Sequence, residues 1–231
     1  MSFDTDLDRL LDRREVWRGG DAASGFETIP TGFDALDHYL PGSGWPADAL
    51  TEILLDRYGI GELSLLMPAL AGLSRKAVTR QQWIVWVGPP FVPYAPALSS
   101  YGVDLSSVLL VHPSGHRRDA LWATEQIIRS GCGIAVLAWV GEADTTSLRR
   151  LQLGIEQYRC WTVLFRPSTA AGVPSPARLR LALSPARETS RTRFRARVDV
   201  LKCRGRGPET LWVDAVDIRG ERYHAGDGEC M

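Results

Sequence analysis

The sequence lacks several features that would quickly assign it to a class of protein. Its 231 residues contain no apolar run of the roughly 18–20 residues that a membrane-spanning helix needs. The first eight residues, Met-Ser-Phe-Asp-Thr-Asp-Leu-Asp, are acidic and contain no apolar core of a secretory signal. The cysteines lie far apart without a C-x-x-C pair, which argues against a zinc site and favours reduced thiols. We therefore expect a soluble cytoplasmic protein with no membrane partner and no bound metal.

The chain also lacks an excess of charge of either sign, because Lys+Arg and Asp+Glu both number 27. Total charge therefore indicates neither a nucleic-acid partner nor a membrane surface. The distribution is uneven, however: residues 166–206 are rich in arginine, and only Glu188 and Asp199 oppose these basic side chains. This segregation leaves three interpretations open, namely a solvated face, a surface for an acidic protein partner, or contact with nucleic acid.

The most informative missing side chains belong to a phosphate-binding loop. Such a loop reads G-x-x-x-x-G-K-[ST] between a strand and a helix, with a Lys for the phosphates and a hydroxyl for Mg²⁺. Here an apolar run leads to Gly59 and Gly61, but Glu62 and Leu63 stand at the two chemical positions. A carboxylate at a helix N-terminus satisfies the local dipole itself and repels phosphate. The sequence therefore predicts a degenerate nucleotide site and no cofactor.

Hydrophobic periodicity predicts an α/β fold with a mostly parallel sheet flanked by helices. Apolar runs predict strands at 50–55, 83–88, 108–112, 134–140 and 161–166. Helical spacing predicts helices at 31–40, 64–76, 94–101, 117–130 and 147–158, so that strands and helices alternate. After Pro167 the pattern of hydrophobicity changes. Alternation of polar and apolar residues there predicts added antiparallel C-terminal strands at 178–184, 194–202 and 210–217.

Glycine-rich breaks divide the chain. Residues 1–20 have helical spacing with an apolar stripe that includes Leu7, Leu10 and Leu11, and 21–27 form a linker after Gly19-Gly20. Residues 28–219 form the core domain, and 220–231 form a flexible tail. The leading helix is expected to dock on a partner, with packing on its own core as the alternative.

The order of these elements and several local sequences resemble the core of the RecA recombinase family. The resemblance covers residues 28–217. Its most similar segments are Ile29-Pro-Thr-Gly-Phe-Asp-Ala-Leu-Asp, Tyr101-Gly-Val-Asp-Leu-Ser-Ser-Val-Leu-Leu, and Leu201-Lys202-Cys203-Arg204. It implies a RecA-like core.

Within that superfamily the chain resembles the ImuA family, RecA-like and SulA-like accessory proteins of bacterial translesion-synthesis cassettes. The motifs concerned are Val16-Trp17-Arg18-Gly19, Gly44-Trp45-Pro46 and Lys202-Cys203-Arg204-Gly205-Arg206-Gly207-Pro208. The resemblance implies action in the SOS response beside RecA, the Y-family-like protein ImuB and an error-prone DNA polymerase. It also implies a cytoplasmic location, with nucleoid association when DNA is damaged.

By the same resemblance, the chain departs from RecA at every catalytic position. Gly88-Pro89-Pro90 replaces the catalytic Glu at the end of the second strand, and Trp139 replaces the Walker-B Asp. Together with Glu62 and Leu63, these changes remove the phosphate cation, the metal ligand and the general base of phosphoryl transfer. We therefore expect no enzymatic activity, and we expect Trp139 to fill space that nucleotide and metal would occupy.

The resemblance also bears on partners. Lys202 and Arg204 match RecA residues that reach across a subunit boundary, so with Arg206 they form a candidate partner interface; solvated strand-end charges are the alternative. The segments that match the DNA-binding loops are short, and 167–176 contains no Lys, Arg or aromatic residue. Because single-strand binding generally needs stacking platforms beside charge, we expect DNA binding to be weak or indirect.

Two other functions remain open at this stage. A SulA-type inhibitor of cell division would share the fold and the loss of catalytic residues. A divergent DNA-dependent ATPase would need Glu142 or Asp144 to replace the lost metal ligand.

Overall fold

The computed structural model describes residues 27–113, 117–185 and 195–214. The predicted helix with Leu7, Leu10 and Leu11, most of the linker, and the tail lie outside these residues. The boundaries at 1–20, 21–27, 28–219 and 220–231 therefore stay predictions.

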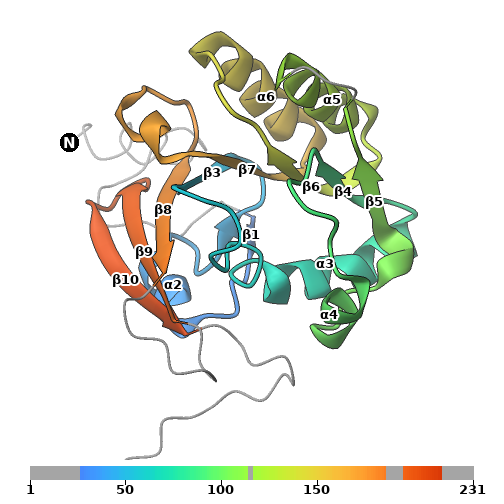
Figure 1. The fold of residues 1–231 in the computed structure, drawn as a ribbon, viewed down its shortest axis with the longest axis horizontal. Helices are drawn as coiled ribbons and strands as arrows, with labels where there is room; N and C mark the ends of the chain where they lie inside the picture. Colours follow the sequence, from blue (N-terminus) through green and yellow to red (C-terminus); the bar gives the residue numbers. More distant parts are fainter. Residues whose placement is uncertain (1–26, 114–116, 186–194, 215–231) are drawn as a thin grey trace, which may run out of the picture.

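An eight-stranded mixed sheet forms the centre of the described chain (Figure 1). Its strand order is β10-β9-β8-β3-β7-β6-β4-β5. The strands are β3 (Leu50–Leu55), β4 (Trp83–Val87), β5 (Val108–Val111), β6 (Gly133–Trp139), β7 (Trp161–Pro167), β8 (Leu179–Pro185), β9 (Arg195–Lys202) and β10 (Glu209–Asp214). A separate two-stranded ribbon pairs β1 (Thr28–Ile29) with β2 (Trp45–Pro46).

Helices cover both faces of this sheet. The helices are α2 (Asp34–Tyr39), α3 (Met67–Arg80), α4 (Ala95–Ser100), α5 (Arg117–Ser130) and α6 (Thr145–Tyr158), with short 3-10 turns at Leu105–Ser107 and Ser168–Gly172. Figure 1 shows α5 and α6 together on one side of the sheet and α3 with α4 on the other. No helix in the described part of the chain is both long and apolar enough to cross a membrane.

Burial on both faces explains why the central strands are mostly apolar. Every residue of β3 and β6 is buried, as expected for parallel strands covered by helices. One core cluster contains Ile53, Trp86, Trp139 and Phe165 with buried residues of α3. The other contains Leu50, Val136 and Leu164 with residues of α5 and α6. The fold class predicted from the sequence is confirmed.

One strand direction was predicted wrongly. The segment read as the first of three antiparallel strands is β8, and β8 pairs in parallel with β3. Only its other neighbour, β9, is antiparallel to it, and β10 is antiparallel to β9. Alternating polar and apolar residues report one buried face and carry no information about strand direction. The direction depends on the crossover from β7 through residues 168–178.

The helix after the degenerate loop begins later than predicted. Helical spacing placed its start at residue 64, whereas α3 begins at Met67 with a proline in its first turn. Residues up to Leu66 form turns instead, with Leu65 and Met67 donating to the carbonyls of Gly61 and Leu63. Pro68 is compatible with a first helical turn because its missing N–H has no partner there.

Candidate functional site

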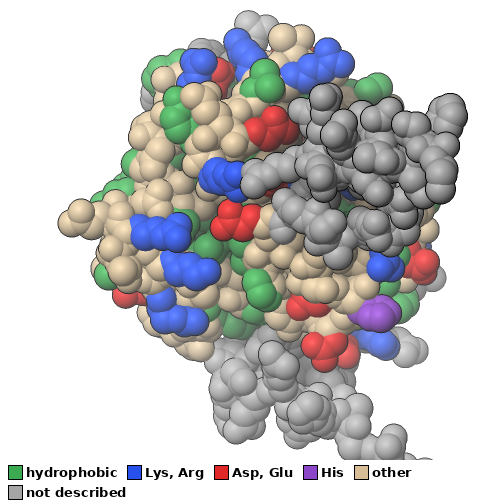
Figure 2. All heavy atoms as spheres, turned by 180° about the vertical axis from the view of Figure 1, so that it is seen from behind, with side chains coloured by type: hydrophobic (Ala, Val, Ile, Leu, Met, Phe, Trp, Pro, Cys, Tyr) green, Lys and Arg blue, Asp and Glu red, His purple; other side chains and the backbone are tan. Residues whose placement is uncertain are grey.

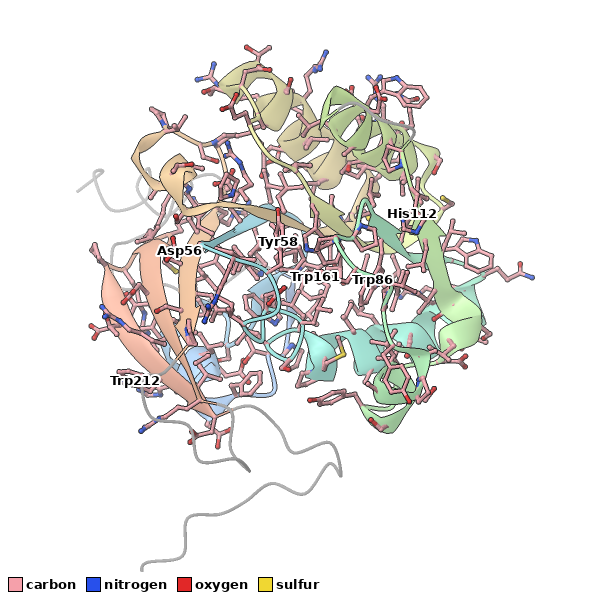
Figure 3. The ribbon with its side chains drawn as sticks, in the orientation of Figure 1. Asp56, Tyr58, Trp86, His112, Trp161 and Trp212 are labelled. Carbon is pink, nitrogen blue, oxygen red and sulfur yellow. The ribbon has the colours of Figure 1, made fainter. Side chains whose placement is uncertain are left out.

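The degenerate loop follows β3 at the carboxyl edge of the sheet, where Figure 3 labels Asp56 and Tyr58. Gly59 and Gly61 both take left-handed backbone conformations, with φ of 80° and 96°. A side chain at either position would be strained, which is why glycine suits them. The two glycines thus allow the chain to turn tightly here, although the chemical side chains of a phosphate-binding loop are missing.

Glu62 turns back and binds the backbone of its own loop. Its Oε1 accepts a hydrogen bond from the N–H of Gly59 at 2.8 Å, and its Oε2 accepts one from the N–H of Ile60 at 2.9 Å. The side chain is almost fully buried, at 4% exposure. Successive backbone N–H groups in such turns form concave anion sites. Here the anion in that site is the carboxylate of Glu62.

This geometry corrects one expectation from the sequence. Glu62 was expected to satisfy the N-terminus of the following helix, but its two acceptors bind N–H groups that precede it. Beside it Ile60 is buried in the core, and Leu63 packs against the same cluster from a half-buried position. The loop is therefore closed by its own carboxylate and by apolar contacts.

Trp139 ends β6 at the predicted Walker-B position. Its ring stacks on Phe165 with centroids 4.6 Å apart and lies 5.7 Å from the ring of Trp86. Only 7% of Trp139 is exposed. Its indole N–H has no hydrogen-bond partner within the described residues. An aromatic stack thus stands at the position that the resemblance matched to the Walker-B Asp. That Trp139 fills space which nucleotide and metal would occupy stays a prediction.

Of the two carboxylates that could replace the lost metal ligand, Asp144 has a structural role. Asp144 caps α6, where its side chain accepts from the backbone N–H and the hydroxyl of Ser147, each at 2.8 Å. Glu142 is exposed beyond the strand end. At the end of β4 the N–H of Gly88 donates to the carbonyl of Val111, and Pro89 is buried.

A buried ionic cluster, which sequence reasoning missed, lies behind the loop. Glu52 is fully buried in β3 and accepts from Arg166 Nη1 at 2.8 Å and from Arg180 Nε at 2.7 Å. Arg166 and Arg180 are also buried, with side-chain exposures of 2% and 7%. The Ser175 hydroxyl donates a further bond to Glu52 at 2.9 Å. The available signal was a glutamate inside the mostly apolar strand at 50–55.

The cluster fixes the connection between β7 and β8. Arg180 Nη2 donates to the carbonyl of Ala170 at 2.7 Å, and Arg166 Nη2 donates to that of Ala143 at 3.3 Å. Lys202 Nζ donates to the carbonyl of Ser175 at 2.9 Å. Burial, and then the positive charge of Arg180, lower the pKa of Lys202 from its ordinary value, whereas Glu52 raises it. The short segment predicted at 167–176 is therefore held by several hydrogen bonds.

These contacts change the interpretation of the arginine-rich segment. Arg166 and Arg180 are buried and serve the fold, and Arg178, Arg195 and Arg197 pair with acidic side chains. Arg187, Arg191 and Arg193 lie outside the described residues. Figure 2 shows one face of the molecule, on which Lys and Arg side chains lie in several places, some of them side by side, with Asp and Glu side chains near others. The described part of the segment is thus no continuous basic surface.

The three candidate interface cations lie together at the end of β9 and in the turn that follows. Lys202 is exposed and bonded to Ser175, as described above. Arg204 is half-buried, and Arg206 lies over the ring of Tyr39, 5.2 Å from its centroid. The Tyr39 hydroxyl donates to the carbonyl of Gly207. The turn is thereby joined to α2, and its role in partner binding stays a prediction.

Comparison with known proteins adds one distant similarity. No protein-family model matches the chain. The cell division inhibitor SulA of Edwardsiella piscicida is 29% identical over 118 residues, which are 50% of this chain and 68% of that protein. The similarity to this SulA thus covers half of the chain. The similarity supports the SulA-like part of the resemblance and does not extend to the ImuA family specifically.

Proposed function

We propose that this chain is a non-catalytic RecA-like protein that acts by binding other proteins of the SOS response. The observation that carries the proposal is the occupied loop: both oxygens of Glu62 bind the N–H groups of Gly59 and Ile60. A nucleotide phosphate would have to displace a buried carboxylate and approach its negative charge. Glu62 itself stands at the position of the missing lysine, and the cation of this loop, Arg57, is exposed.

Two further positions support the same proposal. Trp139 is committed to an aromatic stack with Phe165, and Gly88-Pro89-Pro90 offers no general base. Asp144, one of the substitutes that an ATPase would need, already accepts two hydrogen bonds as a helix cap. Phosphoryl transfer requires positioning, a metal and a base together. We therefore propose that the chain has no ATPase activity.

In its finer form the proposal assigns an ImuA-type role. The chain would serve the translesion-synthesis complex by contacting RecA, or ImuB with its error-prone polymerase, or both. Support comes from the local sequence resemblance and from Lys202, Arg204 and Arg206, which lie together at the end of β9. DNA contact would be weak or indirect.

Titration calorimetry with ATP and Mg²⁺ tests the absence of a nucleotide site. We expect no binding heat from the full chain and no phosphate release with or without single-stranded DNA. Micromolar affinity accompanied by turnover would overturn this part of the proposal.

Pull-down with purified RecA and with ImuB tests the partners. The full chain is compared with a variant that lacks residues 1–20 and with the Lys202→Ala, Arg204→Ala variant. The matched control is Arg75→Ala, Lys76→Ala, because both residues are exposed on α3. We expect the first two variants to bind more weakly and the control to bind normally. If both variants and the control bind equally well, the interface at these residues is wrong.

The distant similarity to SulA favours a second candidate, an inhibitor of cell division. In that case overexpression would make cells filamentous, and the purified chain would block polymerisation of the tubulin-like division protein. The polymerisation assay distinguishes the two candidate functions. An accessory protein of translesion synthesis would bind RecA or ImuB and leave polymerisation of the division protein unchanged.

A further inference from the structure

The loop between β4 and α4 exposes three large apolar side chains in succession. Phe91 is 67% exposed, Val92 81% and Tyr94 73%, with only Pro93 between them. Single exposed apolar residues are ordinary on protein surfaces, whereas contiguous ones mark interaction sites. These three residues define what we call the Phe91–Tyr94 loop.

The loop is held at both ends. On the β4 side, the N–H of Gly88 donates to the carbonyl of Val111 at 2.8 Å. On the α4 side, the carbonyl of Tyr94 accepts from the N–H groups of Ala97 and Leu98, at 3.0 and 3.2 Å. Pro90, Pro93 and Pro96 each fix one backbone dihedral within or beside the loop. Its side chains are thus presented by a pre-organised backbone, which lowers the entropy lost on binding.

The loop and the residues on either side of it in the sequence are uncharged. No Asp, Glu, Lys or Arg occurs from residue 81 to residue 103. Binding to nucleic acid or to an anionic membrane surface depends on Lys and Arg that meet phosphates. The loop offers aromatic and aliphatic surface without such cations, which is the composition of a buried anchor in a protein–protein interface.

The loop also lies at the same edge of the sheet as the degenerate site, and its preceding strand is adjacent to β6, which ends at Trp139. It follows β4, whose Trp86 ring is 5.7 Å from that of Trp139. Figure 3 labels Trp86 in β4 and His112 directly after β5, the two strands whose carboxyl ends border the loop. Two different loops thus follow strands at the carboxyl edge of the sheet. In the loop after β3, Glu62 binds the backbone, and the loop after β4 exposes apolar side chains.

We propose that Phe91, Val92 and Tyr94 are the anchor that inserts into an apolar pocket on a protein partner. The inference rests on the proposed function in that it names the docking site of the same binding protein. The proposed partner is a protein with an apolar pocket on its surface. A second copy of the chain and a lipid bilayer are the competing binding partners that the experiments below distinguish.

The first step identifies the partner at the loop itself. A photo-crosslinking amino acid replaces Phe91 in cells that naturally contain the chain, and a matched variant carries it at Leu153 on α6, which is 64% exposed. We expect a protein that crosslinks at 91 and not at 153. Absence of any crosslinked protein specific to position 91 would overturn the proposal.

The second step measures affinity with that purified protein. The Phe91→Ser, Val92→Ser, Tyr94→Ser variant should bind it at least about 30-fold more weakly, and Leu153→Ser should bind within about twofold of the original chain. Thermal unfolding of both variants should be unchanged, because these side chains are exposed. Equal binding by the triple variant would overturn the anchor, and the proposed function would be judged separately by whether the partner belongs to the SOS response.

Two control experiments distinguish a protein partner from a second copy of the chain and from a lipid bilayer. Sedimentation velocity of the full chain reports self-association, and sedimentation with vesicles of neutral and anionic phospholipid reports membrane binding. If the original chain dimerises or binds vesicles and the triple variant does neither, the pocketed-protein assignment is wrong.

Discussion

The carboxylate of Glu62 lies 2.8 Å from the backbone nitrogen of Gly59 and accepts its hydrogen bond. A residue three positions along the loop thus supplies the anion that the loop's own backbone binds. The arrangement satisfies N–H groups that would otherwise need water or phosphate. It makes Glu62 a stabilising residue of this loop.

We expect Glu62→Ala to lower the free energy of unfolding by about 1–3 kcal/mol, because the buried N–H of Ile60 loses its acceptor together with that of Gly59. Glu62→Gln keeps one acceptor oxygen and should cost less. Urea unfolding followed by circular dichroism measures both. If Glu62→Ala is as stable as the original chain, the carboxylate does not hold the loop.

The ionic cluster around Glu52 predicts a larger effect. Glu52→Gln leaves Arg166 and Arg180 buried without a counter-charge, so it should destabilise the fold by about 3–5 kcal/mol. The control is Glu27→Gln, which breaks an exposed pair with Arg159 and should cost less than about 1 kcal/mol. Equal losses in the two variants, measured by denaturant unfolding, would show that the buried pair is unimportant.

The aromatic stack predicts that the stability of the fold depends on the size of the side chain at position 139. Trp139→Ala should cost about 3–5 kcal/mol, because it empties volume beside Phe165 and Trp86. Trp139→Phe retains an aromatic ring and removes an indole N–H that has no partner among the described residues, so it should cost clearly less. Trp122→Ala is a control at an exposed site. Thermal unfolding compares the three, and a harmless Trp139→Ala would contradict a packing role.

The cap of α6 predicts a dependence on pH. Hydrogen bonds from the backbone N–H and then the hydroxyl of Ser147 hold the pKa of Asp144 below its ordinary value. A depressed pKa adds stability above the unfolded value of about 3.9, and this contribution is lost as the pH falls through the lower folded value.

Asp144→Asn keeps an acceptor but does not titrate, so its stability should fall less steeply than that of the original chain from about pH 5 to about pH 2. Urea unfolding at several pH values measures the two slopes. Asp104→Asn tests the same cause at the turn with Ser106, where hydrogen bonds again lower the pKa. Parallel curves for Asp144→Asn and the original chain would show that this cap does not contribute.

The local sequence was sufficient to predict an element that is mostly apolar or strongly periodic. The strand at 50–55 and the helix at 117–130 were predicted with the bounds that the structure shows. The local sequence was not sufficient where contacts between residues far apart in the chain determine the structure. Nothing local indicates that β8 runs parallel to β3, or that Arg166 and Arg180 meet across Glu52.

The sequence by itself determined the α/β class and the absence of Lys and hydroxyl from the loop, because periodicity and residue identity are local properties. Only the tertiary structure decided what replaces the missing chemistry. Glu62 binds backbone N–H groups two and three residues away, an arrangement set by the folded conformation of the loop. Trp139 stacks on Phe165 because β6 and β7, which are separated in sequence, lie side by side. The tertiary structure also decided the role of the arginine-rich segment. Some of its arginines are buried in the ionic cluster, and others form exposed pairs with acidic side chains. A buried charge requires a partner of opposite charge, and only folding brings that partner within reach.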